Sequence, residues 1–316
     1  EGIVNIKFRF LIIILLGLAL VGCRPTASTG GSSDPGNRGR TADATYSSIS
    51  GVGGTSITPA TVTIILRSKG GAPMVGITPS FTVTPLSNND FNFQCPATDM
   101  NGIATCTFRS WDHSVAKTLS ITSPVEKTGG TVTFTQAASQ ITILTEPAAS
   151  VAGEATPALT ALEVAPVIQL KDPLGAVVTT DSSTSVSVTL TTVTNTNLLG
   201  ATPTLRKNTV NCTTCTFAPV AGVVDFSIVA NNLSVTTSGT YKLAISAANL
   251  TSATSAEFKI ENGAANRLLM TTQPPASVSP LQNFSPQPVV KLLDATGNLV
   301  TNGGCEDETV TMSKTS

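Results

Sequence analysis

The stretch Thr61-Val62-Thr63-Ile64-Ile65-Leu66-Arg67 decides the fold, because every second residue from Val62 to Leu66 is apolar. Successive side chains of a strand point to opposite faces of the sheet, so this period of two predicts a half-buried strand. The same alternation recurs at Ile77–Val83, Phe91–Cys95, Ala104–Phe108, Val115–Ile121 and Val132–Phe134. Six or so short strands separated by Gly, Pro and Asn turns predict a β-sandwich over residues 48–136.

Two motifs within this segment resemble a family. The run Thr61-Val62-Thr63-Ile64-Ile65-Leu66-Arg67-Ser68-Lys69-Gly70-Gly71-Ala72-Pro73-Met74-Val75-Gly76 and the hairpin Thr98-Asp99-Met100-Asn101-Gly102-Ile103-Ala104-Thr105 resemble bacterial Ig-like domains of the invasin and intimin type. In the hairpin, Asn101-Gly102 supplies the positive φ that such a turn needs. The resemblance implies an Ig-like sandwich. Ser68 departs from the Asp common at its position, and the cysteine pair of this segment is not part of the family pattern.

An internal repeat indicates two further units. Ala137–Val151 recurs as Ala264–Val278, and Pro166–Thr179 recurs as Pro288–Thr301. Repetition on this scale is typical of arrays of similar domains. We therefore expect a second Ig-like sandwich at 137–261 and a truncated third repeat at 263–316, which is too short to close a core by itself. The predicted fold class is all-β, with tandem Ig-like sandwiches that follow an N-terminal signal or anchor helix and a flexible linker.

The N-terminus predicts export. Phe10–Gly22 is an apolar run that follows Lys7 and Arg9 and ends at Cys23. As a helix it extends roughly 20 Å, against a hydrocarbon core of about 30 Å, so it is too short to span a membrane. Residues 1–23 have the features of a secretory signal peptide; the alternative is a buried core helix. The sequence Leu20-Val21-Gly22-Cys23 resembles the lipobox of bacterial lipoproteins.

The lipobox resemblance implies cleavage before Cys23 and acylation of its thiol, which would anchor the protein to a membrane. Arg24 is not the Asp that favours inner-membrane retention, so we expect the outer membrane or cell surface. Residues 24–47 contain almost no large apolar side chain and predict a disordered linker. The sequence begins with Glu1 rather than Met and stops at Ser316 within a strand-like pattern, which suggests a fragment or a misassigned start codon.

The chain has six cysteines, five of which remain if Cys23 is lipidated. Cys95 and Cys106 flank the Asn101-Gly102 turn almost symmetrically and are predicted to form a cross-strand disulfide; the alternative is two buried free thiols. Cys212 and Cys215 have the spacing of a redox motif but lie between predicted strands, so a local disulfide that staples a loop is favoured over redox chemistry. Cys305 has no assigned partner.

Composition and the remaining motifs argue against an enzyme. Charged residues make up 12% of the 316 residues and the net charge is −1, so no nucleic acid partner is expected. Trp111-Asp112-His113 holds the only Trp and the only His. His113 is expected to be a loop residue, because no nucleophile motif accompanies it. Trp111 is a candidate contact for a protein or carbohydrate ligand. The acidic run Glu306-Asp307-Glu308 is interpreted as a solvated surface, and neither a metal nor a cofactor is expected.

The leading hypothesis is a lipid-anchored cell-surface protein whose tandem Ig-like domains act as a stalk or adhesion module. Two alternatives remain open. The repeats could present an exported enzyme, such as a hydrolase, whose catalytic domain lies beyond Ser316, or they could form a spacer of the cell envelope without any ligand. Sandwich folds host many functions, so the fold alone does not decide among them.

Overall fold

The structure is a computed structural model that describes residues 39–148, 150–151, 161–301, 310–311 and 313. The predicted signal peptide with Cys23, residues 24–38 of the linker, Cys305 and Glu306–Glu308 lie outside the described residues. Regular structure in the described part is all β, apart from one short 3-10 helix, η2 (Val229–Asn231). Within that part of the chain, no helix is long and apolar enough to cross a membrane. The predicted all-β fold class is confirmed.

The first sandwich consists of two antiparallel sheets. One sheet has the order β1-β2-β5-β4, with β1 at Ser48–Val52, β2 at Ala60–Ile65, β5 at Ile103–Ser110 and β4 at Asp90–Gln94. The other has the order β3-β6-β7, with β3 at Ser80–Thr84, β6 at Ala116–Ser123 and β7 at Lys127–Thr133. The predicted alternation is confirmed, because Val62 and Ile64 on β2 and Leu66 directly after it are completely buried.

A cluster of phenylalanines occupies the core of the first sandwich. The ring of Phe108 on β5 is completely buried, and its centroid lies 5.1 Å from Phe93, 5.3 Å from Phe134 and 5.8 Å from Phe81. These residues come from both sheets and from the segment after β7. Each aromatic pair adds about 0.5–1.5 kcal/mol beyond the burial of area, so the cluster fixes how the two sheets face each other.

The second sandwich is larger. Its first sheet has the order β15-β10-β8, with β15 at Val223–Asp225, β10 at Val167–Lys171 and β8 at Gln140–Thr145. Its second sheet has the order β14-β11-β17-β19-β9, and β18 pairs with β17 beside this path. The strands are β14 (Cys215–Phe217), β11 (Val186–Asn195), β17 (Gly239–Ser246), β19 (Phe258–Glu261), β9 (Ser150–Val151) and β18 (Ala253–Thr254). Among the strands that the structure describes in this sandwich, β19 and β9 alone pair in parallel.

A small sheet of order β13-β12-β16 adjoins the second sandwich, with β13 at Val210–Cys212, β12 at Leu205–Lys207 and β16 at Leu233–Val235. The sequence pattern predicts a strand through Val224, Phe226 and Ile228, but β15 ends at Asp225 and Ile228 is exposed. Asp225 Oδ1 accepts a hydrogen bond from Ser227 N at 2.8 Å, which turns the chain away from the sheet.

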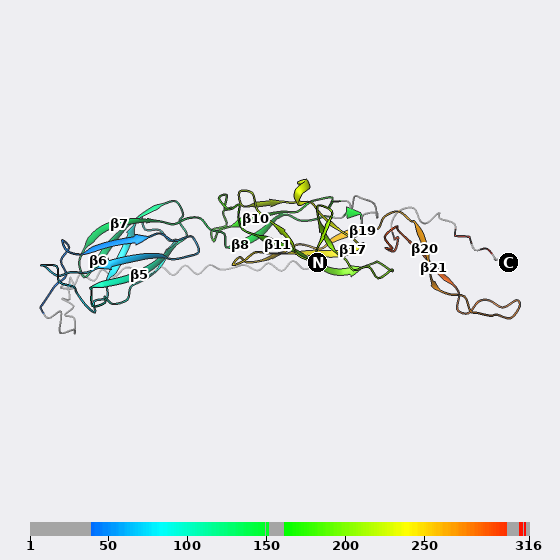
Figure 1. The fold of residues 1–316 in the computed structure, drawn as a ribbon, viewed down its shortest axis with the longest axis horizontal. Helices are drawn as coiled ribbons and strands as arrows, with labels where there is room; N and C mark the ends of the chain where they lie inside the picture. The colour runs from blue at the N-terminus through cyan, green and yellow to red at the C-terminus, as the bar shows by residue number, and fades with distance from the viewer. Residues whose placement is uncertain (1–38, 149, 152–160, 302–309, 312, 314–316) are drawn as a thin grey trace, which may run out of the picture.

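The third repeat contributes an antiparallel ribbon of β20 (Arg267–Thr272) and β21 (Val289–Leu293). The first sandwich, the second sandwich and this ribbon follow one another along the longest axis of the molecule, so the units are arranged end to end (Figure 1). Leu268 and Val289 on the ribbon are exposed.

One turn recurs in all three units. In each, an N–H donates to the carbonyl four residues on: Ser68 to Ala72 at 2.9 Å, Asp172 to Ala176 at 2.9 Å, and Asp294 to Asn298 at 3.0 Å. The residue three positions after the start is a glycine with positive φ, namely Gly71, Gly175 and Gly297. Since only glycine adopts this conformation without strain, the shared turn explains why the glycine recurs in the repeat.

Candidate functional site

The first candidate site is the junction between the two sandwiches. Gln136 Nε2 donates to Asp172 Oδ2 at 2.9 Å and lies 3.3 Å from the carbonyl oxygen of Val177. Ser56 Oγ donates to the carbonyl of Ala137 at 3.0 Å and accepts from the N–H of Ala137 at 2.9 Å. These bonds join the end of the first sandwich to the start of the second.

Asp172 serves the turn and the junction together. Its Oδ1 accepts hydrogen bonds from Leu174 N at 3.0 Å and Ala176 N at 2.9 Å, which hold the recurrent turn. Its Oδ2 faces the first sandwich, where His113 Nε2 lies 3.4 Å away in addition to Gln136. The Asp172 side chain is only 1% exposed, so this carboxylate depends on these donors in place of water.

The junction after the second sandwich uses the same turn. Asn197 Nδ2 donates to the carbonyl of Thr296 and to Asn298 Oδ1, both at 3.1 Å. Asp294 Oδ2 accepts from Gly263 N at 3.1 Å, while Oδ1 holds the turn through Asn298 N at 2.9 Å. Burial acts to raise the pKa of Asp294, but the hydrogen bonds from Asn298 and Gly263 outweigh it and lower the pKa.

A second candidate site is a buried charge cluster in the first sandwich. Lys117 on β6 is completely buried, and its Nζ contacts Asp112 Oδ2 at 2.7 Å, Asp90 Oδ2 at 2.8 Å and the carbonyl oxygen of Pro85 at 3.1 Å. The side chain of Asp90 is also completely buried, whereas that of Asp112 is 19% exposed. The sequence pattern placed Lys117 on the same strand face as Leu119 and Ile121, and both of these are buried too.

Polar neighbours orient the two carboxylates of this Lys117 cluster. Ser87 Oγ donates to Asp112 Oδ2 at 2.6 Å, and Asn89 Nδ2 donates to Asp112 Oδ1 at 2.7 Å. Burial acts to raise the pKa of Asp112, yet the hydrogen bonds from Lys117, Ser87 and Asn89 lower it to about 2. Burial likewise acts to lower the pKa of Lys117, but the hydrogen bonds to Asp112 and Asp90 raise it. Lys117 and Asp112 are therefore both ionised at neutral pH.

Trp111, the predicted ligand contact, lies beside this cluster after the end of β5. Its side chain is 36% exposed, and its ring packs edge-on against Phe91 with 4.9 Å between centroids. The next two residues have separate roles, because Asp112 belongs to the Lys117 cluster and His113 reaches the junction. The predicted ligand contact at Trp111 stays a prediction.

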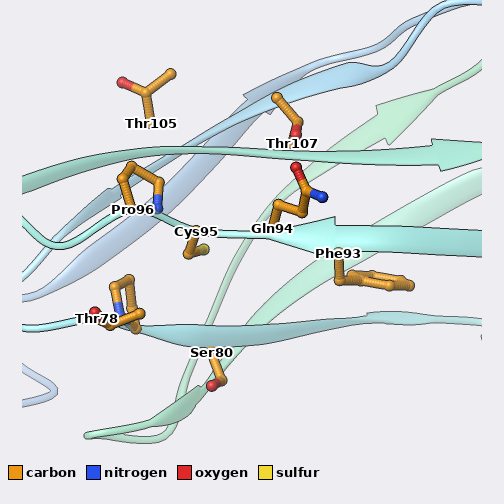
Figure 2. Close-up of a pocket in the computed structure, with 9 residues that line it drawn as sticks. Thr78, Ser80, Phe93, Gln94, Cys95, Pro96, Thr105 and Thr107 are labelled. Atoms are coloured by element: carbon orange, nitrogen blue, oxygen red, sulfur yellow. The ribbon is translucent and has the colours of Figure 1, made fainter.

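A groove of about 690 Å³ runs between β3 and β4 (Figure 2). These are end strands of the two sheets of the first sandwich, so among the described strands neither has a neighbour on its outer side. Threonine, serine and glutamine side chains alternate with apolar ones along the groove, which is lined by Thr78, Pro79, Ser80, Phe93, Gln94, Cys95, Pro96, Thr105 and Thr107. The sequence pattern gave no sign of this groove, because it depends on the order of the strands.

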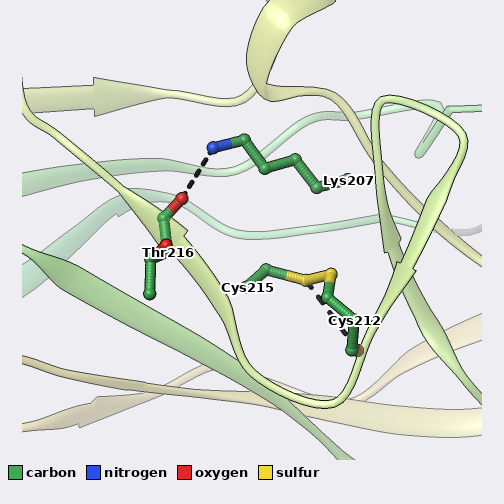
Figure 3. The surroundings of a disulfide bond; sticks show 4 residues. All are labelled: Lys207, Cys212, Cys215 and Thr216. Atoms are coloured by element: carbon green, nitrogen blue, oxygen red, sulfur yellow. Dashed lines mark hydrogen bonds between the residues drawn. A yellow bond between two sulfur atoms is a disulfide. The ribbon is translucent and has the colours of Figure 1, made fainter.

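Both predicted cysteine pairs are bonded in the structure. The Cys95–Cys106 disulfide joins the segment after β4 to β5, and the Cys212–Cys215 disulfide closes the turn between β13 and β14 (Figure 3). Neither Cys212 nor Cys215 lies at a helix N-terminus, in agreement with a structural staple. In the described part of the chain, no group of three or more His, Cys, Asp or Glu side chains could hold a metal ion.

Comparison with known proteins finds likeness only among solved structures. No protein-family model matches the chain, and no curated protein matches it. The adhesin InvE of Yersinia pseudotuberculosis is 18% identical with a TM-score of 0.31, and the match covers 72% of this chain and 61% of InvE. Yersinia pseudotuberculosis InvD is 16% identical with a TM-score of 0.29, over 82% of this chain and 73% of InvD. Invasin, described as a bacterial integrin-binding protein, is 13% identical with a TM-score of 0.30, over 81% of this chain and 47% of invasin.

Proposed function

We propose that this protein is the stalk or adhesion module of a lipid-anchored cell-surface protein, built from Ig-like units at 48–136, 137–261 and 263–316. The observation that carries the proposal is the recurrent Asp-x-x-Gly turn, which accepts hydrogen bonds from the preceding unit at both junctions, from Gln136 at Asp172 and from Asn197 at Thr296 and Asn298. A chain of independent domains on flexible linkers would not need such contacts.

The junction contacts suit a structure that must hold a set direction. A hydrogen bond to a charged group contributes about 1.5–3 kcal/mol, and the bond from Gln136 to the buried carboxylate of Asp172 is of this kind. Together with the pair of bonds between Ser56 and Ala137, it opposes bending between the sandwiches. Both junctions are therefore suited to hold successive units in line, as a stalk requires.

Lipid anchoring at Cys23 completes the proposal. The expected linker would end before Ala42, because Ala42 pairs with Ser68 and Asp43 N donates to the carbonyl of Arg67, so residues 42–47 belong to the first sandwich. With the acyl group at the N-terminus, the first sandwich would then lie nearest the outer membrane and later units would project outward. Trp111 and the groove between β3 and β4 are then the candidate contacts for a protein or carbohydrate ligand, because an exposed aromatic ring and an unpaired strand edge both serve recognition.

The anchor is tested by fractionating bacteria that express the full chain. The wild type is expected in the outer-membrane fraction, and Cys23→Ser is expected to leave it. Labelling of intact cells with a membrane-impermeant reagent then tells surface display from a location inside the envelope. Wild-type protein that is found entirely in the soluble fraction would contradict the anchor.

The stalk role is tested through Gln136→Ala, which removes a junction contact without touching either core. Spin labels placed on the two sandwiches are expected to give a narrow distance distribution in the wild type and a broader one in the variant. Gln140→Ala is the matched control. Gln140 Nε2 donates to the backbone carbonyl oxygen of Asp172 at 3.2 Å, but both residues belong to the second sandwich, so this bond does not cross the junction. Equally narrow distributions for Gln136→Ala and the wild type would argue against a junction-stiffened stalk.

The adhesion role is tested by binding of the displayed protein to host cells and to glycan and protein arrays. Trp111→Ala is expected to weaken binding at least tenfold. Tyr46→Ala is the matched control, since Tyr46 is an exposed aromatic residue of the same sandwich at 49% exposure. Equal binding by both variants would remove Trp111 from the contact surface.

A further inference from the structure

The Lys117 cluster is unusual because it places an amine against a carboxylate with both of these side chains completely buried. Lys117 Nζ and Asp90 Oδ2 are 2.8 Å apart, and both side chains are completely buried. Lys117 belongs to the sheet β3-β6-β7, whereas Asp90 begins β4 in the opposite sheet. The two groups therefore meet across the sandwich.

An ion pair between Lys117 and Asp90 leaves one carboxylate oxygen of Asp90 without a hydrogen-bond donor in the described part of the chain. Asp90 Oδ1 is buried and has no hydrogen-bond partner among the described residues, while Oδ2 accepts from Lys117 Nζ and from Ser87 N, each at 2.8 Å. Ser87 Oγ lies 3.3 Å from Asp90 Oδ2, but its proton is donated to Asp112. An unsatisfied oxygen of a buried carboxylate destabilises the fold, because no water replaces the missing donor. Burying an ion pair is also costly, since both charges lose their hydration.

We propose that Lys117 and Asp90 condense to an isopeptide bond that links the two sheets of the first sandwich. This amide would replace two buried charges with a neutral group and would remove one of the two Asp90 carboxylate oxygens. The proposal depends only on the Lys117 cluster, so it stands apart from the stalk or adhesion function.

Asp112 supplies the proton transfer that the condensation needs. One proton passes transiently from the Lys117 ammonium to Asp112 Oδ2 along the existing 2.7 Å hydrogen bond. This transfer is uphill, because the pKa of Asp112 is low and that of Lys117 is raised, so the condensation is expected to be slow. The lone pair of the neutral Nζ then attacks the carboxyl carbon of Asp90, and a carbon–nitrogen bond forms. One oxygen of Asp90 leaves as water, taking one proton back from Asp112 and a second from the nitrogen as the carbon–oxygen bond breaks. No atom changes oxidation state, and Asp112 ends as it began.

Three features of the site favour this reaction. Ser87 and Asn89 hold Asp112 in place through hydrogen bonds of 2.6 and 2.7 Å, so the proton carrier is positioned before the reaction begins. The carbonyl of Pro85, 3.1 Å from Nζ, orients the amine between the two carboxylates. The partial exposure of Asp112 gives the released water a route to solvent.

The test is the mass of the full chain, purified in soluble form and then reduced and alkylated so that the disulfides do not contribute. After allowance for cleavage and acylation at Cys23, the mass is expected to be one water molecule lower than the mass calculated from the sequence. Trypsin is expected to leave the bond after Lys117 uncut, because an acylated lysine is no substrate. Digestion would then yield peptide 70–109 joined to peptide 110–127, and fragmentation would locate the bond at Asp90.

The control is built into the same protein. Lys259 Nζ and Glu261 Oε1 are 2.9 Å apart, but their side chains are 55% and 26% exposed, so this pair is expected to stay unlinked. Lys117→Arg and Asp90→Ala are expected to show the full mass, and Asp112→Asn is expected to lose most of the cross-link. If Lys117→Arg or Asp90→Ala fails to fold, the wild-type peptide map still decides the matter.

Three results would overturn the proposal. The first is wild-type protein of full mass. The second is a water lost elsewhere, as in an aspartyl succinimide, with normal cleavage after Lys117. The third is a cross-link from Lys117 to Asp112 in place of Asp90, which would overturn the assignment of the two carboxylates. Complete cross-linking in Asp112→Asn would refute the role of Asp112 as the proton carrier.

Discussion

Replacing Tyr241 by phenylalanine should destabilise the second sandwich while leaving the first unchanged. Tyr241 on β17 is completely buried, and its hydroxyl lies 2.8 Å from Thr237 Oγ1, 3.1 Å from the carbonyl oxygen of Thr237 and 3.2 Å from that of Ser238. Phenylalanine keeps the ring and its packing but removes these contacts. A buried carbonyl that loses its donor costs about 1–3 kcal/mol, so we expect a loss of that size in the free energy of unfolding.

The assay follows the two sandwiches separately in urea. Trp111 is the only tryptophan, so its fluorescence reports the first sandwich alone, while far-ultraviolet circular dichroism reports both. Tyr241→Phe is expected to lower the urea midpoint of the second sandwich and to leave the Trp111 transition in place. Tyr46→Phe is the control, because the exposed Tyr46 should change stability by less than about 0.5 kcal/mol.

The same residue predicts a dependence on alkaline pH. Burial raises the pKa of Tyr241 above its ordinary value of 10.0, although the hydrogen bond with Thr237 opposes this. The unfolded chain therefore loses the phenolic proton first, so the stabilisation is complete below pH 10 and is lost as pH rises towards the folded pKa. Tyr241→Phe should reduce this loss of stability above pH 10. If Tyr241→Phe matches Tyr46→Phe both in urea and above pH 10, the argument from the buried hydroxyl is wrong.

Three further predictions concern the turns and the first disulfide. Gly102 and Gly175 both have positive φ, but of the two only Gly102 would bring an added Cβ against a neighbouring atom, Leu66 O, at 2.5 Å. We therefore expect Gly102→Ala to lower the free energy of unfolding by about 2–4 kcal/mol, measured by Trp111 fluorescence, and Gly175→Ala by about 1 kcal/mol, measured by circular dichroism. Equal losses would refute this reasoning. The double change Cys95→Ala and Cys106→Ala should lower the stability of the first sandwich by up to about 3 kcal/mol, and an unmoved Trp111 transition would contradict it. The pKa of Asp181 is lowered because hydrogen bonds from Thr184 and Ser183 outweigh burial, so its contribution is present above the ordinary value of 3.8 and lost as pH falls through the folded pKa. Asp181→Asn should reduce the loss of stability at acidic pH, measured by urea unfolding at a series of decreasing pH values. An unchanged dependence of stability on pH would count against the hydrogen bonds.

Patterns that are local in the sequence predicted much of the fold. The alternation at Val62, Ile64 and Leu66 defines β2, and the glycine of the Asn101-Gly102 turn has the expected positive φ of 73°. Both disulfides could be predicted because each pair of cysteines is close in the sequence and lies next to a turn. These features depend on neighbours within about a dozen residues, which a single sequence displays directly.

The candidate sites depend on contacts between distant residues, so the sequence could not supply them. Lys117 meets Asp90 only because β6 and β4 face each other across the core, although the position of a lysine on an apolar strand face does indicate a buried cation. Gln136 and His113 reach Asp172 only through the end-to-end packing of two sandwiches. The strand predicted through Ile228 failed for a local reason, the turn at Asp225, which competes with the alternation.

The recurrent turn also bears on how such a protein can change its length. Because Asp172 and Asp294 present similar turns to the units before them, a duplicated unit placed in the array would bring its own acceptor and would meet a turn of the same kind. Gain or loss of a whole unit would therefore alter the reach of the protein without requiring a new type of interface. Variation in unit number would then change the length of the protein while each junction kept the same kind of contact.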